Sequence, residues 1–272
     1  MNIQQKPSIS FYMTVKNGSG HISEAIQSVR NQTISSWELV IVDDGSMDST
    51  NEIILRFSEI DNRINVVSTT GIGRGAALNR AIQLCSSDIL TNLDADDLAH
   101  PRRVEFLLKA FDNKENYGAI TGLARLFNDD MNFDWPNVDW DGAIHDVTKR
   151  LISSNPVSHA AVGLSRTALQ AVGGYDENRL SQFDYDLWIR MADKGYKIGK
   201  INAFLGAKRI HSSQSYERRK HLSYAWSSAQ VRWRAVKVLN ASRLIGMLSV
   251  GAHLAWACLP SSIRMLVRRL LQ

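Results

Sequence analysis

The 272-residue chain is long enough to bury a core as one large domain, or as one domain with an appendage, and its 44% hydrophobic content excludes disordered and fibrous classes. No basic stretch leads into an apolar run at its start, so we expect no secretory signal and a cytoplasmic location. The two cysteines, Cys85 and Cys258, lie far apart without metal-ligand spacing, and we predict that both are core residues.

The net charge of +5 is distributed unevenly along the chain. Residues 207–272 hold 12 Lys/Arg and one acid, Glu217, whereas residues 1–206 hold 20 Lys/Arg and 26 Asp/Glu. A segment this basic predicts contact with something anionic, such as a membrane surface or a polyphosphate, unless it is a solvated basic helix. We expect no nucleic acid partner.

Strand-like and helix-like segments alternate over the first hundred residues. The predicted strands, which are apolar and rich in β-branched residues, are 8–14, 37–42, 64–67 and 88–93. Apolar residues at helical spacing predict helices between them, the first with Ser19 as its N-cap. This alternation predicts an α/β fold with a mainly parallel sheet that helices cover on both faces.

The pattern is less regular after residue 100. We predict helices at 104–111 and 184–194 and strands at 118–127 and 157–164. Residues 128–141 are acidic and aromatic with little periodicity, which predicts a loop that acts as a lid or contacts an acceptor. Beyond His211 we predict helix to the end of the chain. The apolar run 244–259 is shorter than the ~20 residues of a spanning helix, so it lies on a membrane or packs on the core.

One acidic cluster, Asp94-Ala95-Asp96, closes the fourth predicted strand, where open α/β sheets bind ligands. Two carboxylates this close need a cation, because an isolated buried carboxylate is too costly. Mg²⁺ or Mn²⁺ would satisfy them and would leave coordination positions for phosphate oxygens and water. Taken alone, however, an Asp-x-Asp is more often a solvated loop or a pair of helix-capping acids.

A second acidic cluster, Asp43-Asp44, closes the second predicted strand. Its carboxylates are suited to accept hydrogen bonds from a base or from ribose hydroxyls, and an Asx turn is an equally good interpretation. A third pattern, Gly71-x-Gly73-x-x-Ala76, follows a strand and opens a helix, as in NAD(P)-dependent dehydrogenases. It occurs in the third unit of the chain and leaves Asp97 beside Asp94 unexplained, which disfavours the dehydrogenase.

Several stretches, in order and spacing, resemble the family 2 inverting glycosyltransferases of the GT-A fold. They are residues 8–50, GIGRGAALNRAI, LTNLDADDLAHPRRV, NPVSHAAVGLSRTALQAVGGYDE, FDYDLWIRMADKGYKI and RIHSSQS, and they cover roughly residues 9–211. The resemblance implies a metal-dependent enzyme of bacterial polysaccharide or glycolipid biosynthesis, which moves a sugar from a nucleotide diphosphate to a saccharide or lipid-linked acceptor. It also implies a GT-A domain at 1–212, with a nucleotide-binding half (1–100) and an acceptor-binding half (101–212).

The resemblance further implies roles for individual residues. Asp184 is the general base, with Asp186 as the fallback, while Asp96 and His211 are the metal ligands. The residues implied for nucleotide-sugar binding are Thr14, Val15, Asn17, Asp43, Asp44, Arg74, Asp94 and Ala95. The remaining residues, 213–272, form a basic helical extension that we expect to contact the anionic inner face of the cytoplasmic membrane.

Two positions depart from the family pattern. Phe183 stands where the family carries the glutamate of a Glu-Asp pair, which keeps open a catalytically inactive relative that only binds sugar or lipid. Lys16 stands where many relatives place a tyrosine that stacks on the base. The loss of stacking weakens the family's uridine preference, yet a UDP-sugar remains our first expectation, with a GDP- or dTDP-sugar next.

Overall fold

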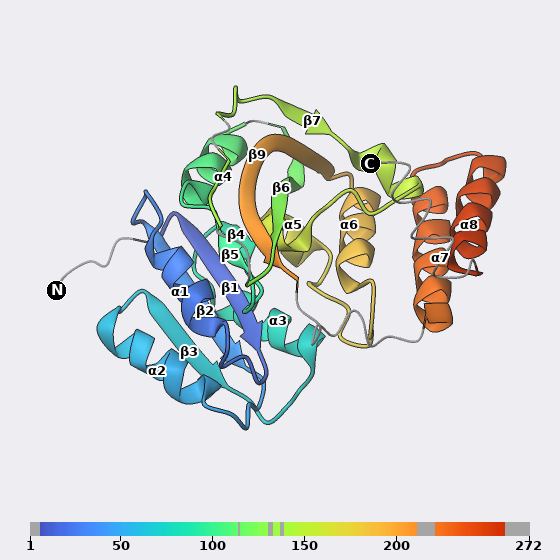
Figure 1. Ribbon diagram of the computed structural model, residues 1–272. Helices are drawn as coiled ribbons and strands as arrows, with labels where there is room; N and C mark the ends of the chain where they lie inside the picture. The colour runs from blue at the N-terminus through green and yellow to red at the C-terminus, as the bar shows by residue number, and fades with distance from the viewer. Residues whose placement is uncertain (1–5, 114, 130–132, 137–138, 211–220, 259–272) are drawn as a thin grey trace.

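The computed structural model describes residues 6–258 except 114, 130–132, 137–138 and 211–220. Within these residues, one sheet contains the strand order β3-β2-β1-β4-β8-β6-β9-β5, and β7 pairs with β9 outside this path (Figure 1). The prediction of an α/β fold is confirmed.

The first half of the sheet is parallel. Its strands are β1 (Ile9–Val15), β2 (Trp37–Asp43), β3 (Ile64–Ser68) and β4 (Ile89–Asn92). The helices that connect them are α1 (Ile22–Arg30), α2 (Thr50–Ile60) and α3 (Arg74–Leu84). Because side chains alternate along a strand, Phe11 and Met13 of β1 join the core beneath α1, whereas Tyr12 joins the core beneath α3. Both faces of the sheet are therefore covered.

The second half of the sheet mixes strand directions. Its elements are β5 (Leu98–Ala99), α4 (Arg103–Phe111), β6 (Tyr117–Phe127), β7 (Ile144–Asp146), β8 (Val162–Ser165), α5 (Arg166–Ala171), α6 (Phe183–Asp193) and β9 (Lys197–Arg209). Strand β8 runs antiparallel to both β4 and β6, whereas β6 and β9 are parallel. Two 3₁₀ helices, η1 (Thr148–Ile152) and η2 (His159–Ala161), lie before β8.

Two local predictions were wrong. The strand predicted at 157–164 begins only at Val162, because the Ser158 N–H donates to Thr121 Oγ1 and the Ala160 carbonyl accepts from Arg103, and neither group is left for a strand ladder. Ser19 does not cap α1. The Gly18 carbonyl accepts the first helical N–H groups instead, while the Ser19 N–H donates to Asp48.

Two helices follow β9 in the described part of the C-terminal region, α7 (His221–Val238) and α8 (Arg243–Cys258). Helix α7 buries Ala225, Ala229, Val231 and Ala235 and contacts α6 and η1, and α8 packs on α7 (Figure 1). Among the described residues, no helix has both the length and the apolar character that crossing a membrane requires. Cys85 is buried as predicted; the side chain of Cys258 lies outside the described residues.

Candidate functional site

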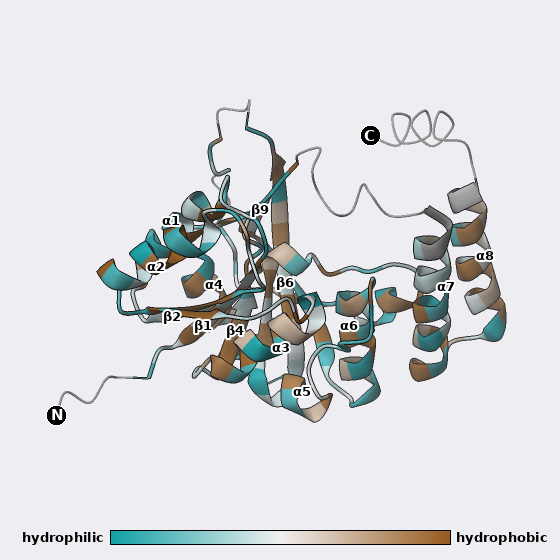
Figure 2. Ribbon diagram, turned by 90° about the horizontal axis from the view of Figure 1, so that it is seen from below, coloured by the Kyte–Doolittle hydropathy of each residue, from teal (hydrophilic) through white to brown (hydrophobic). Residues whose placement is uncertain are grey.

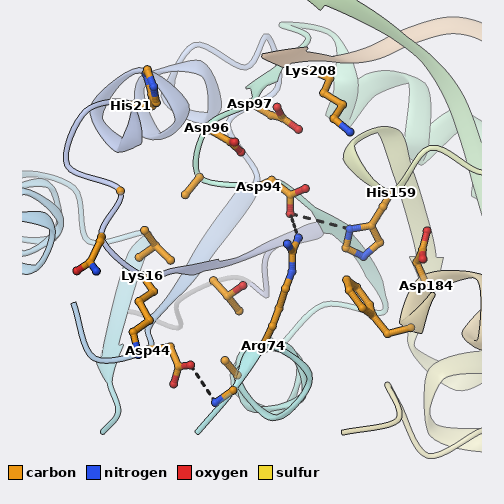
Figure 3. Close-up of a pocket in the computed structure, with 18 of the residues that line it drawn as sticks. Lys16, His21, Asp44, Arg74, Asp94, Asp96, Asp97, His159, Asp184 and Lys208 are labelled. Carbon is orange, nitrogen blue, oxygen red and sulfur yellow. Dashed lines mark hydrogen bonds and ion pairs between the residues drawn. The ribbon is translucent and has the colours of Figure 1, made fainter. Parts of the chain in front are cut away.

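A cavity of about 1050 Å³ lies at the carboxyl ends of β1 and β4 and extends to the first turn of α6 (Figure 3). Most of the predicted site residues line it together: Thr14, Val15, Asn17, Asp44, Arg74, Asp94, Ala95, Asp96 and Asp184. Asp43 is not among the lining residues, and His211 lies outside the described residues. Parallel strands explain the convergence, because their carboxyl ends share one edge of the sheet.

Asp43 and Asn17 shape the loops beside this cavity. The buried carboxylate of Asp43 accepts hydrogen bonds from the Ser46 N–H (3.0 Å) and the Asn51 amide (3.1 Å). Asn17, in a left-handed conformation with φ 55°, donates its N–H to Ser46 Oγ (2.9 Å) and accepts the Met47 N–H (2.8 Å). These contacts tie the loop after β1 to the loop after β2, so the position of Asn17 depends on that of Asp43.

Asp44 ties the end of β2 to the start of α3. Its carboxylate accepts from Thr69 Oγ1 (2.7 Å) and from the N–H groups of Ile72 (2.7 Å) and Gly73 (2.9 Å). Burial acts to raise the pKa of Asp44, but these hydrogen bonds outweigh it and lower the pKa. The amides that a dinucleotide loop would offer to a pyrophosphate are therefore already bound within the protein.

Asp94 and Arg74 form an ion pair of 2.8 Å in the centre of the cavity (Figure 3). Burial acts to raise the pKa of Asp94, but the Arg74 guanidinium outweighs it and holds the pKa at about 2. The Arg74 guanidinium also lies over the Phe183 ring, 5.2 Å from its centroid. Phe183, which stands where the family pattern has a glutamate, therefore still contacts a positive charge. Arg74, predicted to bind the nucleotide-sugar, thus pairs with a carboxylate of the same cavity.

The acids after β4 fit a divalent cation. Asp96 and Asp97 line the cavity, and Asp97 Oδ1 accepts the Arg209 N–H (2.9 Å), whereas its Oδ2 is buried with no hydrogen-bond partner among the described residues. Burial and the charges of Asp94 and Asp96 raise the pKa of Asp97 well above its usual value. No three Asp, Glu, His or Cys side chains of the described chain form a metal cage. Mg²⁺ does not need one, since one or two carboxylates, phosphate oxygens and waters suffice.

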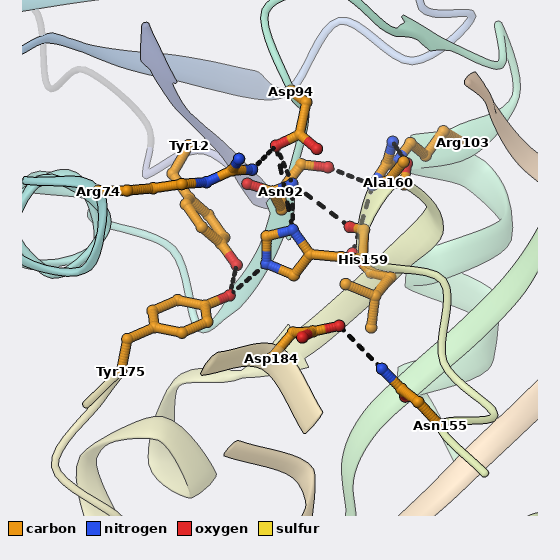
Figure 4. A network of polar contacts seen from close by, with 11 residues as sticks. Tyr12, Arg74, Asn92, Asp94, Arg103, Asn155, His159, Ala160, Tyr175 and Asp184 are labelled. Atoms are coloured by element: carbon orange, nitrogen blue, oxygen red, sulfur yellow. Dashed lines mark hydrogen bonds and ion pairs between the residues drawn. The ribbon is translucent and has the colours of Figure 1, made fainter. Parts of the chain in front are cut away.

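His159 lies beside these acids and was not predicted as a site residue. In Figure 4 its ring joins Asn92 to Tyr175, with Nδ1 3.0 Å from Asn92 Nδ2 and Nε2 2.8 Å from the Tyr175 hydroxyl. Because the Asn92 amide donates to Nδ1, Nε2 carries the proton and donates to Tyr175. The Tyr175 hydroxyl lies 2.8 Å from that of Tyr12. A lone histidine in an apolar stretch was the only local signal for this network.

Two histidines make the stability of the fold depend on pH. Burial lowers the pKa of His159, and burial lowers the pKa of His100, which packs between Phe106 and Trp135, to about 4. Below about pH 6.5 the unfolded chain binds protons at both imidazoles that the folded protein does not. We therefore expect these two imidazoles to lower the free energy of unfolding by about 1–3 kcal/mol between pH 7 and pH 5, while the raised pKa of Asp97 acts in the opposite direction and offsets part of the loss measured by urea denaturation.

Single substitutions locate this effect. His100→Gln is expected to flatten the pH dependence, whereas His145→Gln, at an exposed position on β7, is expected to leave it unchanged. Equal slopes for the wild type and His100→Gln would contradict the contribution of His100.

Asp184 lies in the first turn of α6, on the side of the cavity opposite Lys16 and Asp44 (Figure 3). Asn155 Nδ2 donates to its Oδ2 at 2.9 Å. Asp186, the fallback base, is about 200° further around the helix and does not line the cavity. Only 1% of its side chain is exposed, and Arg190 (2.7 Å), Arg234 (2.9 Å) and Arg179 (3.4 Å) surround it.

Four other lining residues with polar side chains were not predicted as site residues: His21, Gln182, Lys208 and Tyr224. They come from the residue before α1, the residue before α6, β9 and α7, and only the tertiary fold brings these segments to one cavity. No local spacing in the sequence signals such a meeting.

Known proteins are similar to this chain in sequence and in fold. The model of "Glycosyl transferase family 2" matches residues 10–170, more than half of the chain. The chain belongs to glycosyl transferase family 2. It is 27% identical over 237 residues to an uncharacterized glycosyltransferase of Methanocaldococcus jannaschii, covering 85% of this chain and 81% of that protein. It is 24% identical to the UDP-Gal:alpha-D-GlcNAc-diphosphoundecaprenol beta-1,3-galactosyltransferase of Escherichia coli, covering 95% and 94% of the two chains.

Solved structures share the fold at lower identity. TarS 1–349 of S. aureus, in complex with UDP-GlcNAc, superposes with a TM-score of 0.68 at 15% identity, covering 91% of this chain and 71% of that one. The mannosyltransferase PcManGT of Pyrobaculum calidifontis, in complex with GDP-Man and Mn²⁺, has a TM-score of 0.63 at 17% identity, covering 98% and 81%. The family 2 transferase therefore has the GT-A fold and is a glycosyltransferase that uses a nucleotide-sugar.

Proposed function

We propose that this family 2 transferase is a metal-dependent inverting enzyme that moves a sugar from UDP to a saccharide or lipid-linked acceptor. The observation that carries the proposal is one cavity with Asp94, Asp96 and Asp97 at a strand end and a separate carboxylate, Asp184, across from Asp44 (Figure 3). The Escherichia coli relative, named for UDP-Gal and a diphosphoundecaprenol-linked sugar, supports this donor and this type of acceptor.

The nucleotide is proposed to lie over the ends of β1 and β2. Thr14, Val15 and Asn17 line this part of the cavity beside Asp44 and Lys16, where a base and a ribose find both hydrogen-bond donors and acceptors. Arg74, in the first turn of α3, is suited to exchange its pairing with Asp94 for the donor diphosphate. Asp43, which shapes the adjoining loop, acts on the nucleotide through Asn17.

Asp96 and the unpartnered Oδ2 of Asp97 are proposed to hold Mg²⁺ or Mn²⁺, with His211 as a further ligand. Such an ion, when bound, neutralises negative charge on the departing diphosphate. Asp94 pairs with Arg74 until the donor binds, and its carboxylate is then proposed to accept a hydrogen bond from the ribose. Ala95 lets the chain pass close to the donor between the two acids.

Asp184 is proposed to be the general base. The acceptor hydroxyl gives its proton to the Asp184 carboxylate as its oxygen bonds to the anomeric carbon, and the bond from that carbon to the diphosphate oxygen breaks on the opposite face. The configuration is inverted, and the nucleoside diphosphate leaves. Asn155, which donates to Asp184 Oδ2, orients the carboxylate.

An inactive, sugar- or lipid-binding relative is the second candidate, and Phe183 favours it. The Phe183 ring packs against His159 (5.7 Å) and Tyr175 (5.9 Å) where a second carboxylate is usual. Binding of UDP with manganese, without turnover of any donor in the presence of native acceptors, would establish this candidate in place of the transferase.

Calorimetric titration of UDP and GDP with and without manganese tests the donor site. We expect manganese-dependent binding of UDP by the wild type and a loss of at least about tenfold in affinity for Asp96→Ala, since that variant lacks a metal ligand. Asp88→Ala is the matched control, because it removes an exposed acid that directly precedes the N-terminal end of β4, away from the cavity. This variant is expected to bind UDP like the wild type. Binding that needs no metal, or an unaffected Asp96→Ala, would contradict the metal site.

Three parts of the chain are proposed to have separate roles. Residues 1–100 hold the nucleotide, residues 101–212 the acceptor, and the basic extension 213–272 meets an anionic membrane surface on the cytoplasmic side.

A further inference from the structure

The outward face of α8 is apolar and uncovered in the described part of the protein. Leu244, Ile245, Met247 and Leu248 are 62%, 53%, 57% and 65% exposed. Exposed small residues at positions 251, 252 and 255 continue the same helical stripe, and the only charged residue of α8 is Arg243 at its start. Figure 2 shows apolar residues recurring along α8, at the edge of the molecule. A contiguous apolar face of this kind marks an interaction surface.

The opposite face of α8 is firmly packed. A Cβ added at Gly246 would lie 2.9 Å from the Val236 methyl groups and 3.2 Å from the Trp233 ring, so the two helices are in close contact there. Ser249 Oγ donates to the Ile152 carbonyl at 3.0 Å. Helix α7 in turn is held to α6 by the ion pair of Arg234 with the buried Asp186 (2.9 Å). The apolar face therefore has a fixed orientation relative to the catalytic cavity.

The charge and length of this region select the partner. Residues 218–272 contain ten Lys/Arg and no Asp or Glu, so a second copy of the same surface would be repelled whereas an anionic surface would be attracted. The 16 residues of α8 span about 24 Å, less than the ~30 Å hydrocarbon core of a bilayer. Trp226 of α7, 61% exposed, adds an aromatic side chain of the type found at membrane interfaces.

We propose that the outward face of α8 is the surface on which the protein docks onto a bilayer rich in anionic lipid. Leu244 and Leu248 enter the interface, and Arg243, exposed at the start of α8, contacts lipid phosphates. The first turns of α7 supply Tyr224 to the wall of the cavity, so the docking helices and the cavity share one element. The inference rests on the proposed function, because it names the surface by which the extension meets the membrane and places a lipid-linked acceptor beside this wall.

Vesicle sedimentation of the full chain tests the surface. The wild type is expected to bind vesicles of phosphatidylcholine with 30% phosphatidylglycerol and to stay in solution with phosphatidylcholine alone. Leu244→Glu/Leu248→Glu is expected to lower the partition coefficient at least about tenfold, because two charges enter the apolar face. Leu55→Glu/Ile60→Glu, on exposed positions of α2 at the far end of the sheet, has the same charge change and is expected to retain binding within about twofold.

Each other outcome overturns the proposal. If the wild type binds no vesicle, or if both double variants lose binding equally, α8 is not the docking surface. If light scattering finds a wild-type dimer that Leu244→Glu/Leu248→Glu dissociates, the partner is a second copy. UDP titration of the same variants separates this result from the donor site: the α8 variant is expected to bind UDP like the wild type, so a failure of docking leaves the proposed donor site standing.

Discussion

Asp184→Asn is expected to lower the rate of sugar transfer about 10³-fold while it leaves UDP binding within about twofold of the wild type. A positioned general base typically contributes 10²–10⁴-fold to the rate, and an asparagine amide cannot take the acceptor proton. The substitution preserves the size of the side chain and an oxygen that accepts from Asn155. Because Asp184 lies across the cavity from Asp44 and Lys16, its loss is not expected to weaken nucleotide binding (Figure 3).

A matched control separates the chemistry from the helix. Asp193→Asn removes the same charge from the exposed last residue of α6 and is expected to retain full activity. The rate of sugar transfer is measured from the release of UDP in the presence of acceptor, and the affinity for UDP is measured by calorimetry. Equal activity of the wild type and Asp184→Asn would place the base elsewhere, and a parallel loss of UDP binding would indicate a structural role instead.

The first half of the fold was predictable because its signals are local. Buried parallel strands produce continuous apolar runs such as 39–42, and each run ends in polar residues at the same edge of the sheet. The prediction that Asp44, Asp94 and Asp96 line one site therefore needed only the strand ends and the parallel direction. Whether the second half is parallel depends on pairings between distant segments, such as β8 with β4, and no local pattern encodes them.

The partners of individual side chains were less predictable than their positions. Asp43 and Asp44 have the same residue type at adjacent positions, yet only Asp44 lines the cavity, since successive side chains at a strand end point to opposite sides. The pairing of Arg74 with Asp94 requires the start of α3 to meet the end of β4, which is a tertiary contact. For the same reason the contacts of His159 could not be predicted from the sequence.

Arg103→Met is expected to lower the free energy of unfolding by about 3–5 kcal/mol. The guanidinium of Arg103 is fully buried and joins β4 to the segment that contains η2 and β8 (Figure 4). It donates to Thr91 Oγ1 (2.9 Å) and to the carbonyls of Asn92 (2.6 Å), Ala160 (2.9 Å) and Val162 (3.3 Å). Methionine fills a similar volume but donates nothing. The Val162 carbonyl keeps the Thr91 hydroxyl as a donor, whereas the hydrogen bonds from Arg103 to the Asn92 and Ala160 carbonyls are lost, and each buried polar group left without a partner costs about 1–3 kcal/mol.

Two further variants show whether charge or geometry matters at Arg103. Arg102→Met, at the neighbouring surface position paired with Glu105 and Asp139, is expected to leave the free energy of unfolding in urea denaturation almost unchanged, because exposed ion pairs contribute little. Arg103→Lys keeps the cation but not the planar fork, so it is expected to recover only part of the stability. Full recovery by lysine would show that the charge alone holds this junction, and equal losses for Arg102→Met and Arg103→Met would contradict the buried hydrogen bonds as its source. Because Asn92 and Ala160 flank Asp94 and His159 in sequence, the methionine variant should also weaken UDP binding at temperatures where it remains folded.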